Sequence, residues 1–339
     1  MEETTTKNPI QLKFFEKLKH LAPANISLAN EIADVLEISA DGAYRRMRGE
    51  SVLSMDEMVK LCRHYKIPPD AIVASDENTS ATFQFRKMIQ DESGFEDYLK
   101  NIYNDLQRIN ASHPKQIIYA ASDIPIFHQF YLPEYAAFKM YWWQKAILNL
   151  PSVEGKKFDP SEIRNDFIET CKRITDTYIQ IPSIEIWHND TFSSNLAMLD
   201  FAWESGWFDS KEKAFLVCDS LTKILNSLEK QAEKSSKFIK EEKWAENEGN
   251  FTFYHSEVIL TNNHIFVTAG NARVLYLTHN TFNSMATTNK VFCDETESWL
   301  KNLMKKSTQI SGMGEKQRHK FFKKCHEKVS AVVTRISES

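Results

Sequence analysis

Apolar residues recur every three or four positions through the first 65 residues, which is the spacing that places side chains on one face of a helix. Polar and charged residues fill the intervening positions, so each segment has one face suited to burial. A serine opens three of these segments, where its hydroxyl can accept a hydrogen bond from a free amide of the first helical turn. The pattern predicts short helices over residues 10–21, 27–37, 39–48 and 54–66, with a last helical turn at 70–73.

The third of these segments carries an unusual combination of residues. Ala43 and Met47 lie four positions apart and therefore share one face of the helix. Three arginines leave the same short helix near its C-terminal end. Gly49 follows, at a position where helices commonly end in a left-handed residue that glycine adopts without a steric penalty. A short helix with a small apolar seam and several arginines indicates an anionic partner.

Helix caps, a turn and an apolar seam follow one another in a fixed order in this region. The residues that form them are Ile32, Ala33, Leu36, Glu37, Ile38, Ser39, Ala43, Met47, Arg48, Gly49, Glu50, Leu53 and Ser54. This order resembles the Cro/repressor-like (XRE-type) helix-turn-helix family over about residues 8–75. The resemblance implies that residues 39–48 form a recognition helix in the major groove, with Ala33 where the two helices cross and Ile38 buried after the turn. Glu37 stands where the family often has glycine, so a positive φ there is expected to carry strain. Gly42 lowers the helix propensity by roughly 1 kcal/mol relative to alanine.

The expected DNA contacts divide by position along this helix. Residues at its start and one turn later can reach base edges, where arginine can bond guanine bidentately and Asp41 can accept from cytosine. Arg48 is expected to meet phosphate, whereas Arg46 can instead lay its stem on the domain core. Ser27 and Ser54 could bond phosphate through helix N-termini, although simple capping explains both equally well. The candidate DNA-binding residues are Ser27, Ser39, Ala40, Asp41, Tyr44, Arg45, Arg46 and Arg48.

Composition places this region within a larger chain of ordinary globular character. The protein has 339 residues, 42% of them hydrophobic, and a net charge of −4, which predicts two domains and argues against indiscriminate coating of nucleic acid. Residues 1–75 hold ten Lys or Arg against eleven Asp or Glu, so DNA affinity must come from local placement of charge. Five scattered cysteines, no secretory signal and no apolar run of about 20 residues predict a cytoplasmic protein without a membrane partner.

Beyond residue 80, long helical segments alternate with short β-prone ones. Helices are predicted at 95–109, 135–145, 161–180, 192–205, 210–240, 295–306 and 315–335, and strands at 116–120, 251–255, 258–260, 264–268 and 273–278. We expect a helix-turn-helix domain at 8–74, a linker at 75–81 and a dimerisation domain at 82–339. The predicted fold class is mainly α with an α+β C-terminal domain, whose larger helical part contains a small, mainly antiparallel sheet.

Catalytic chemistry finds little support in the sequence. Nine glycines and no phosphate-cradling loop disfavour nucleotide enzymes. His255, His264 and His279 could bind a metal only if the strands bring them together. Neither enzymatic activity nor a cofactor is therefore expected. The aromatic residues between 127 and 143 predict either a packed core or a hydrophobic effector pocket or dimer face.

The sequence as a whole favours a bacterial, homodimeric transcriptional regulator that binds double-stranded operator DNA. Its C-terminal domain would dimerise and could sense a small-molecule effector. Two rival interpretations stay open: an adaptor that binds proteins without specific DNA binding, and an enzyme whose N-terminal domain serves for DNA targeting. Affinity for DNA that falls steeply with salt would favour the regulator.

Overall fold

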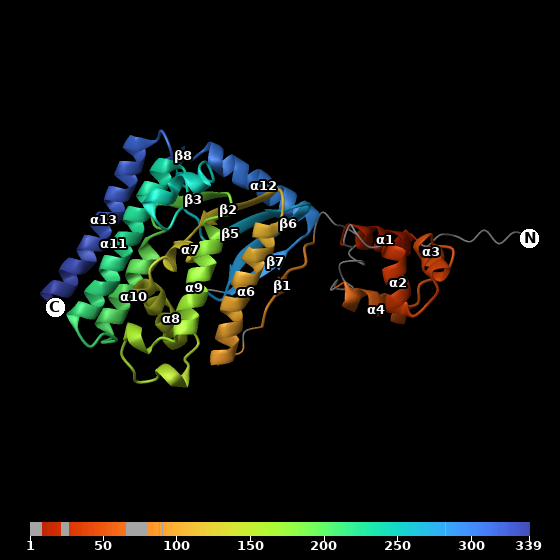
Figure 1. The fold of residues 1–339 in the computed structure, drawn as a ribbon, viewed down its shortest axis with the longest axis horizontal. Helices are drawn as coiled ribbons and strands as arrows, with labels where there is room; N and C mark the ends of the chain where they lie inside the picture. The colour runs from red at the N-terminus through yellow and green to blue at the C-terminus, as the bar shows by residue number, and fades with distance from the viewer. Residues whose placement is uncertain (1–8, 22–26, 66–79, 88, 90, 282) are drawn as a thin grey trace, which may run out of the picture. The chain divides into compact units, whose positions relative to one another are not determined.

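The structure is a computed structural model that describes residues 9–21, 27–65, 80–87, 89, 91–281 and 283–339 (Figure 1). The chain divides into two units, Met1–Thr82 and Phe83–Ser339. Each unit has its own hydrophobic core. The helical turn predicted at 70–73 and most of the linker predicted at 75–81 lie outside the described residues.

The smaller unit contains four short helices in its described part: α1 (Pro9–Leu21), α2 (Leu28–Leu36), α3 (Ala40–Met47) and α4 (Met55–His64). They confirm the four helices predicted from the apolar spacing, with ends that differ by one or two residues. Their apolar faces meet in one cluster, which contains Phe14, Phe15, Leu18, Ile32, Ala33, Leu36, Ala43, Leu61 and Cys62. This shared cluster stabilises the bundle, because helices this short are marginal in water by themselves.

The larger unit is organised around an eight-stranded sheet with the order β1-β7-β6-β5-β2-β3-β4-β8 (Figure 1). The strands are β1 (Gln84–Phe85), β2 (Lys115–Ala121), β3 (Ser183–His188), β4 (Phe251–Ser256), β5 (His264–Ala269), β6 (Ala272–His279), β7 (Asn283–Thr287) and β8 (Thr308–Gln309). β2, β3 and β4 run parallel, and the other pairings are antiparallel. Parallel neighbours need long crossover connections, which is why helices separate these three strands in the sequence.

Helices cover both faces of this sheet. On one face, α12 (Lys290–Lys305) packs Leu300 and Leu303 with Ile118 and Ile186 of the central strands. The opposite face carries a thicker layer, built from α6 (Glu92–Ala111), α7 (Ile126–Gln129), α8 (Pro133–Trp142), α9 (Asn165–Tyr178), α10 (Ser193–Glu204), α11 (Lys211–Lys234) and α13 (Glu315–Glu338). A π-helix, Trp143–Ile147, continues α8, and 3-10 turns lie at Pro151–Val153, Pro160–Glu162 and Glu241–Asn247. Because strand side chains alternate between faces, the central strands are buried on both sides.

The predicted fold class, mainly α with an α+β C-terminal part, is confirmed. The sheet is larger than predicted, however, since the sequence pattern does not predict β1, β3, β7 and β8 as strands. The strand predicted at 258–260 is wrong, because these residues form no strand. The chain must pass from β4 to β5, which lies beyond β3 and β2 in the sheet, and residues 258–260 belong to that connection. Leu260 packs into the cluster under α12, whereas Ile259 is 69% exposed.

A buried carboxylate explains why β3 escapes prediction. Glu185 lies in the middle of β3 and is fully buried, with its oxygens 2.7, 2.6 and 2.9 Å from His128 Nε2, the Tyr178 hydroxyl and Trp187 Nε1. Burial by itself raises the pKa of Glu185, but His128 and these hydrogen bonds hold that pKa below its ordinary value. Lys237 is also fully buried, and burial lowers its pKa to about 7. Hydrogen-bonding partners from α7, α9 and β3 itself therefore make a charged residue acceptable in a central strand.

The five cysteines are all buried and free, as their scattered spacing predicts. Burial raises the pKa of Cys218 and of Cys325 to about 12, so both thiols stay protonated at neutral pH. Among the helices that the structure describes, we find none with the length and apolar character needed to cross a membrane.

Candidate nucleic-acid interface

α2 and α3 form the two helices of a helix-turn-helix unit. Ala33 on α2 and Ala43 on α3 are 7% and 0% exposed and belong to the same cluster, so small side chains face the inside of this unit. Ile38, in the turn, packs against that cluster and is partly buried. The buried place expected for Ala33 is thereby confirmed, whereas Ile38 packs at its expected place but is only partly buried. With one side of α3 occupied by the core, its remaining side is available to a partner.

The turn between the two helices depends on a left-handed residue. Glu37 has φ 57° and ψ 44°, so the positive φ expected at this position is confirmed. Its amide donates to the Asp34 carbonyl at 3.3 Å, and the amide of Ile38 donates to the Ala33 carbonyl at 3.0 Å. These two bonds close α2 in the Schellman arrangement, which normally favours glycine at the left-handed position. A glutamate there therefore costs roughly 1 kcal/mol.

Both ends of α3 are capped as predicted. The Ser39 hydroxyl accepts a hydrogen bond from the Gly42 amide at 3.1 Å. At the other end Gly49 has φ 73°, and its amide donates to the Arg46 carbonyl at 3.0 Å. The amide of Glu50 donates to the Arg45 carbonyl at 2.8 Å, which completes a second Schellman closure. The helix is thus defined at both ends, and its outward side chains leave from well-determined positions.

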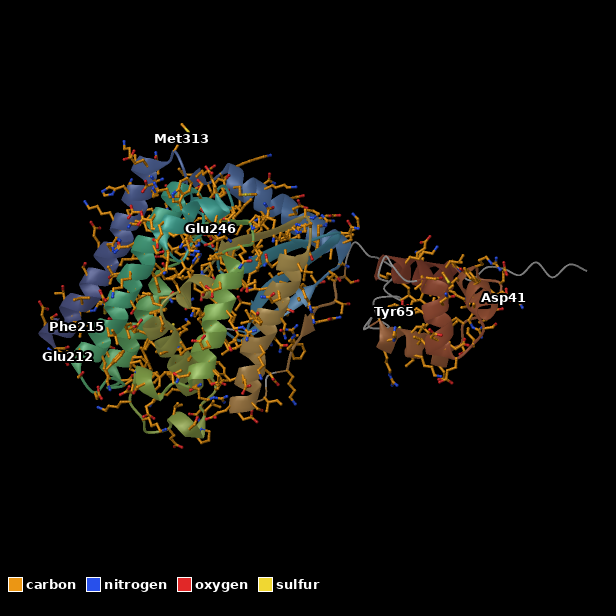
Figure 2. The ribbon with its side chains drawn as sticks, in the orientation of Figure 1. Asp41, Tyr65, Glu212, Phe215, Glu246 and Met313 are labelled. Carbon is orange, nitrogen blue, oxygen red and sulfur yellow. The ribbon has the colours of Figure 1, made fainter. Side chains whose placement is uncertain are left out.

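The side of α3 that faces away from the core carries most of the predicted DNA-binding residues. The exposed ones are Ser39, Ala40, Asp41, Tyr44, Arg45 and Arg48. Asp41 points outward from α3 (Figure 2), and Tyr44 is 47% exposed, which is high for a large aromatic residue. Arg45 has no ion-pair partner within the described parts of the chain. Its guanidinium is therefore free to bind an external anion or a base edge.

Arg46 differs from the other arginines because its guanidinium turns toward α4. It donates to the Glu57 carboxylate through Nη2 at 2.7 Å and through Nε at 3.2 Å, and to the Gly42 carbonyl at 3.2 Å. The side chains of Arg46 and Glu57 are only 21% and 20% exposed. Of the two roles expected for Arg46, this geometry favours the structural one within the bundle over a contact with DNA.

Arg48, Ser54 and Ser27 are the residues for which the sequence suggests contacts with phosphate. Arg48 is exposed and pairs with Glu50 at 2.9 Å, a surface pair that a phosphate can replace at little cost. Ser54 forms a complete capping box with Glu57, so capping accounts for this serine. Ser27 occupies the N-cap position of α2, but its hydroxyl makes no capping hydrogen bond. The side-chain cap predicted at Ser27 is therefore wrong, and that hydroxyl is available for another partner.

Gln11 is a residue that the sequence pattern does not single out. It lies on α1, is 5% exposed, and its amide nitrogen donates to the carbonyls of Arg46 and Ser51 at 2.8 and 2.7 Å. Its amide oxygen accepts from the Leu53 amide at 2.9 Å. One side chain thereby ties the segment after α3 to the first helix. In the sequence, Gln11 differs from its neighbours only as a polar residue at an otherwise apolar helical position. This pattern does not predict which groups its side chain bonds.

Charge around α3 is balanced rather than basic. Arg46 and Arg48 each pair with a glutamate, whereas Asp41 and Glu37 add negative charge at the exposed start of the helix. Such a surface makes few phosphate contacts, and phosphate contacts supply most sequence-independent affinity for DNA. The charge on this surface therefore provides little sequence-independent attraction to nucleic acid.

Residues 11–91 match the family model described as BetR domain. The match covers about a quarter of the chain, from α1 through β1, and it supports a small helical, DNA-binding-like domain of the helix-turn-helix type with a general role in regulation. It does not confirm the Cro/repressor type expected from the sequence. Comparison with curated proteins and with solved structures finds no match.

Beyond the BetR domain, the other predicted sites do not assemble. His255 and His264 lie on β4 and β5, which β3 and β2 separate in the sheet, and His279 lies on β6. No group of three or more metal-binding side chains occurs in the part of the chain that the structure describes. The aromatic residues between 127 and 143 belong to the core or pack against it, which favours the core interpretation. Tyr141 is the exception, since it also lines a cavity.

Proposed function

We propose that this protein is a bacterial, cytoplasmic regulator of transcription in which α3 of the BetR domain reads the major groove of operator DNA. The observation that carries the proposal is the exposed, doubly capped α3 with Asp41, Tyr44 and Arg45 on its outward side. Arg45 would bond guanine, Asp41 would accept from cytosine, and Arg48 would leave Glu50 for a phosphate. Arg46 has a structural role in this scheme.

A second part of the proposal is that the protein binds DNA as a homodimer through its larger unit. One helix-turn-helix module buries little surface, and two of them can address half-sites about one DNA turn apart. The balanced charge around α3 makes this pairing more necessary, since a single copy has few phosphate contacts. A small-molecule effector would act by favouring one placement of the two helices over another. We propose a binding role for the larger unit rather than a catalytic one.

The test is fluorescence anisotropy with DNA from upstream of the protein's own gene, beside scrambled DNA of equal length. We expect the protein to prefer the upstream DNA, and affinity for both DNAs to fall with salt. The double variant Arg45→Ala/Arg48→Ala should lose the preference, because one bidentate base contact discriminates by about 1–3 kcal/mol, or roughly 5- to 150-fold.

The matched control is Arg63→Ala, which removes one exposed charge from α4 and leaves α3 intact. This variant should keep the preference for upstream DNA. Equal binding of both DNAs by the wild-type protein would refute specific recognition. No binding to either DNA, together with a partner protein bound in a salt-insensitive manner, would support the adaptor interpretation instead.

A further inference from the structure

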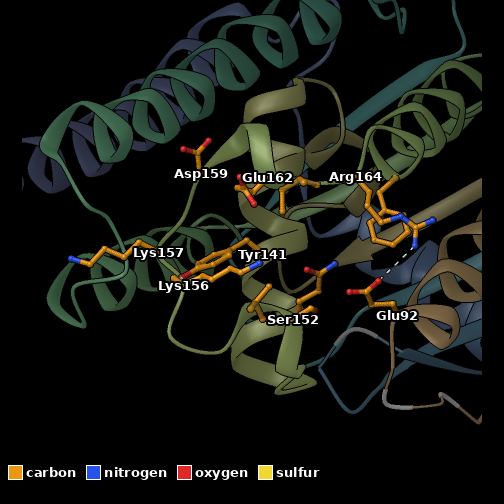
Figure 3. Close-up of a pocket in the computed structure, with 12 residues that line it drawn as sticks. Glu92, Tyr141, Ser152, Lys156, Lys157, Asp159, Glu162 and Arg164 are labelled. Atoms are coloured by element: carbon orange, nitrogen blue, oxygen red, sulfur yellow. Dashed lines mark hydrogen bonds and ion pairs between the residues drawn. The ribbon is translucent and has the colours of Figure 1, made fainter.

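The larger unit contains a cavity of about 110 Å³ whose wall comes from the π-helix Trp143–Ile147, the segment 152–164 that follows it, and the start of α9 (Figure 3). Tyr141 of α8 and Glu92 of α6 complete the wall. The π-helix forms the C-terminal end of α8 and is followed by Leu148. The cavity thus lies beside the wide last turns of this helix.

Hydrogen bonds hold the segment over this cavity in place. The Tyr141 hydroxyl donates to the Lys156 carbonyl at 2.8 Å. The ammonium of Lys145, within the π-helix, donates to the same carbonyl and to the Val153 carbonyl. Lys145 also lies 5.2 and 5.3 Å from the ring centres of Tyr141 and Trp207. The wall is therefore built by specific contacts and is not a gap between loosely packed loops.

Gln144 is the feature that points to a ligand. Gln144 is only 7% exposed and lines the cavity. Its side-chain amide makes no hydrogen bond to any described residue. The amide is open to the cavity rather than sealed inside the protein, so water satisfies it in the free protein. A bound polar molecule would take the place of this water.

The charges on the wall define that molecule further. Arg164 already pairs with Glu92, Glu96 and Asp166, and Asp159 pairs with Lys213. Lys156 and Glu162 have no ion-pair partner in the described ranges of the chain. Figure 3 shows Lys156 alongside Tyr141, whereas Lys157 extends away from the cavity. The wall therefore offers one cation, one anion and one amide to a ligand.

We propose that this cavity binds the ammonium and carboxylate groups of a free α-amino acid. An enclosed cavity of about 150 Å³ accommodates benzene with its six heavy atoms, so 110 Å³ holds about five, the number in the charged part of an amino acid. Lys156 would bind the carboxylate, Glu162 the ammonium group, and Gln144 either one. The amino-acid side chain would extend through the open side. The inference deepens the proposed function, since it identifies the class of effector on which regulation would rest.

The test follows thermal unfolding of the full-length protein by tryptophan fluorescence, because all seven tryptophans lie in the larger unit. The probes are the twenty amino acids at 10 mM, with propionate, ethylamine and acetamide as analogues that lack one or both charges. With a Kd on the order of 1 mM, a bound amino acid should raise the melting temperature by roughly 3 °C. The analogues should raise it by less than about 1 °C.

Two neighbouring lysines provide the matched control. Lys156→Gln should abolish the shift, whereas Lys157→Gln should preserve it, because Lys157 also borders the cavity but its side chain extends away from it (Figure 3). Gln144→Leu should also abolish the shift without lowering the melting temperature of the free protein, because the amide it removes makes no hydrogen bond to any described residue. No amino acid that raises the melting temperature, or equal behaviour of the two lysine variants, would overturn the proposal. Because no DNA is present, this outcome is independent of the test for DNA binding.

Discussion

Replacing Arg46 by alanine should destabilise the BetR domain by about 2 kcal/mol. The guanidinium makes two hydrogen bonds to Glu57, at 2.7 and 3.2 Å, and one to the Gly42 carbonyl at 3.2 Å. A hydrogen bond to a charged group contributes about 1.5–3 kcal/mol, whereas an exposed ion pair contributes only about 0.2–1 kcal/mol. The pair lies between these limits, since both side chains are about one-fifth exposed. Glu57 also keeps its bond from the Ser54 amide at 2.9 Å, which limits the loss.

The assay is hydrogen exchange of backbone amides in α3 and α4 of the full-length protein, followed by mass spectrometry. Tryptophan fluorescence cannot report on this domain, because it contains no tryptophan. A factor of ten in the opening equilibrium corresponds to about 1.4 kcal/mol, so Arg46→Ala should accelerate exchange roughly 30-fold.

The effect should depend on pH. Burial raises the pKa of Glu57, but hydrogen bonds from Arg46 and from the Ser54 amide hold that pKa below its ordinary value of 4.5. A carboxyl group with a lowered pKa stabilises the fold above its unfolded pKa, and this contribution disappears as the pH falls through the folded value. The difference in exchange between wild type and Arg46→Ala should therefore shrink as the pH is lowered from 7 toward 3.

Arg45→Ala is the matched control for this prediction. Arg45 is exposed and has no ion-pair partner in the described parts of the domain, so its removal should change stability by less than about 0.5 kcal/mol. A double-mutant cycle with Glu57→Ala measures the coupling directly. Exchange that rises less than threefold in Arg46→Ala, or equally in both arginine variants, would refute the structural role of Arg46.

Two further predictions concern backbone strain and a buried charge. Glu37→Gly should stabilise the BetR domain by roughly 0.5–1 kcal/mol. Glycine adopts the left-handed turn without strain, and its greater freedom in the unfolded chain offsets only part of this gain. Slower amide exchange in α2 would confirm the prediction. Lys237 has a pKa of about 7 when buried, whereas an unfolded lysine keeps its proton to about pH 10.4. The free energy of unfolding of the larger unit should therefore rise between pH 7 and pH 9, by up to about 1.4 kcal/mol for each pH unit. Lys237→Met should remove this rise. The measurement is urea unfolding followed by tryptophan fluorescence. If the stability of the variant rises as much as that of the wild type, other titrating groups cause the rise.

The helices of the BetR domain follow from local patterns in the sequence. Serine caps, apolar spacing and Gly49 act within a few residues of one another, so the caps of α3 and the strained turn at Glu37 could be predicted correctly. The exposed face of α3 follows from the same periodicity, because the residues that do not face the core must face outward. The cap expected at Ser27 failed, since a favourable residue type does not oblige its hydroxyl to bond the helix.

Contacts between distant residues decided everything that local patterns left open. The sequence leaves two roles open for Arg46, and only the approach of α4 with Glu57 favours the structural one. β3 was missed because Glu185 breaks its apolar pattern, and the partners that satisfy this carboxylate come from α7, α9 and β3 itself. The place of β4 beside β3, rather than beside β5, depends on crossover connections that no single segment encodes. The cavity beside Gln144 likewise exists only once α6, α8 and α9 have packed together, because its wall is assembled from segments that share no local pattern.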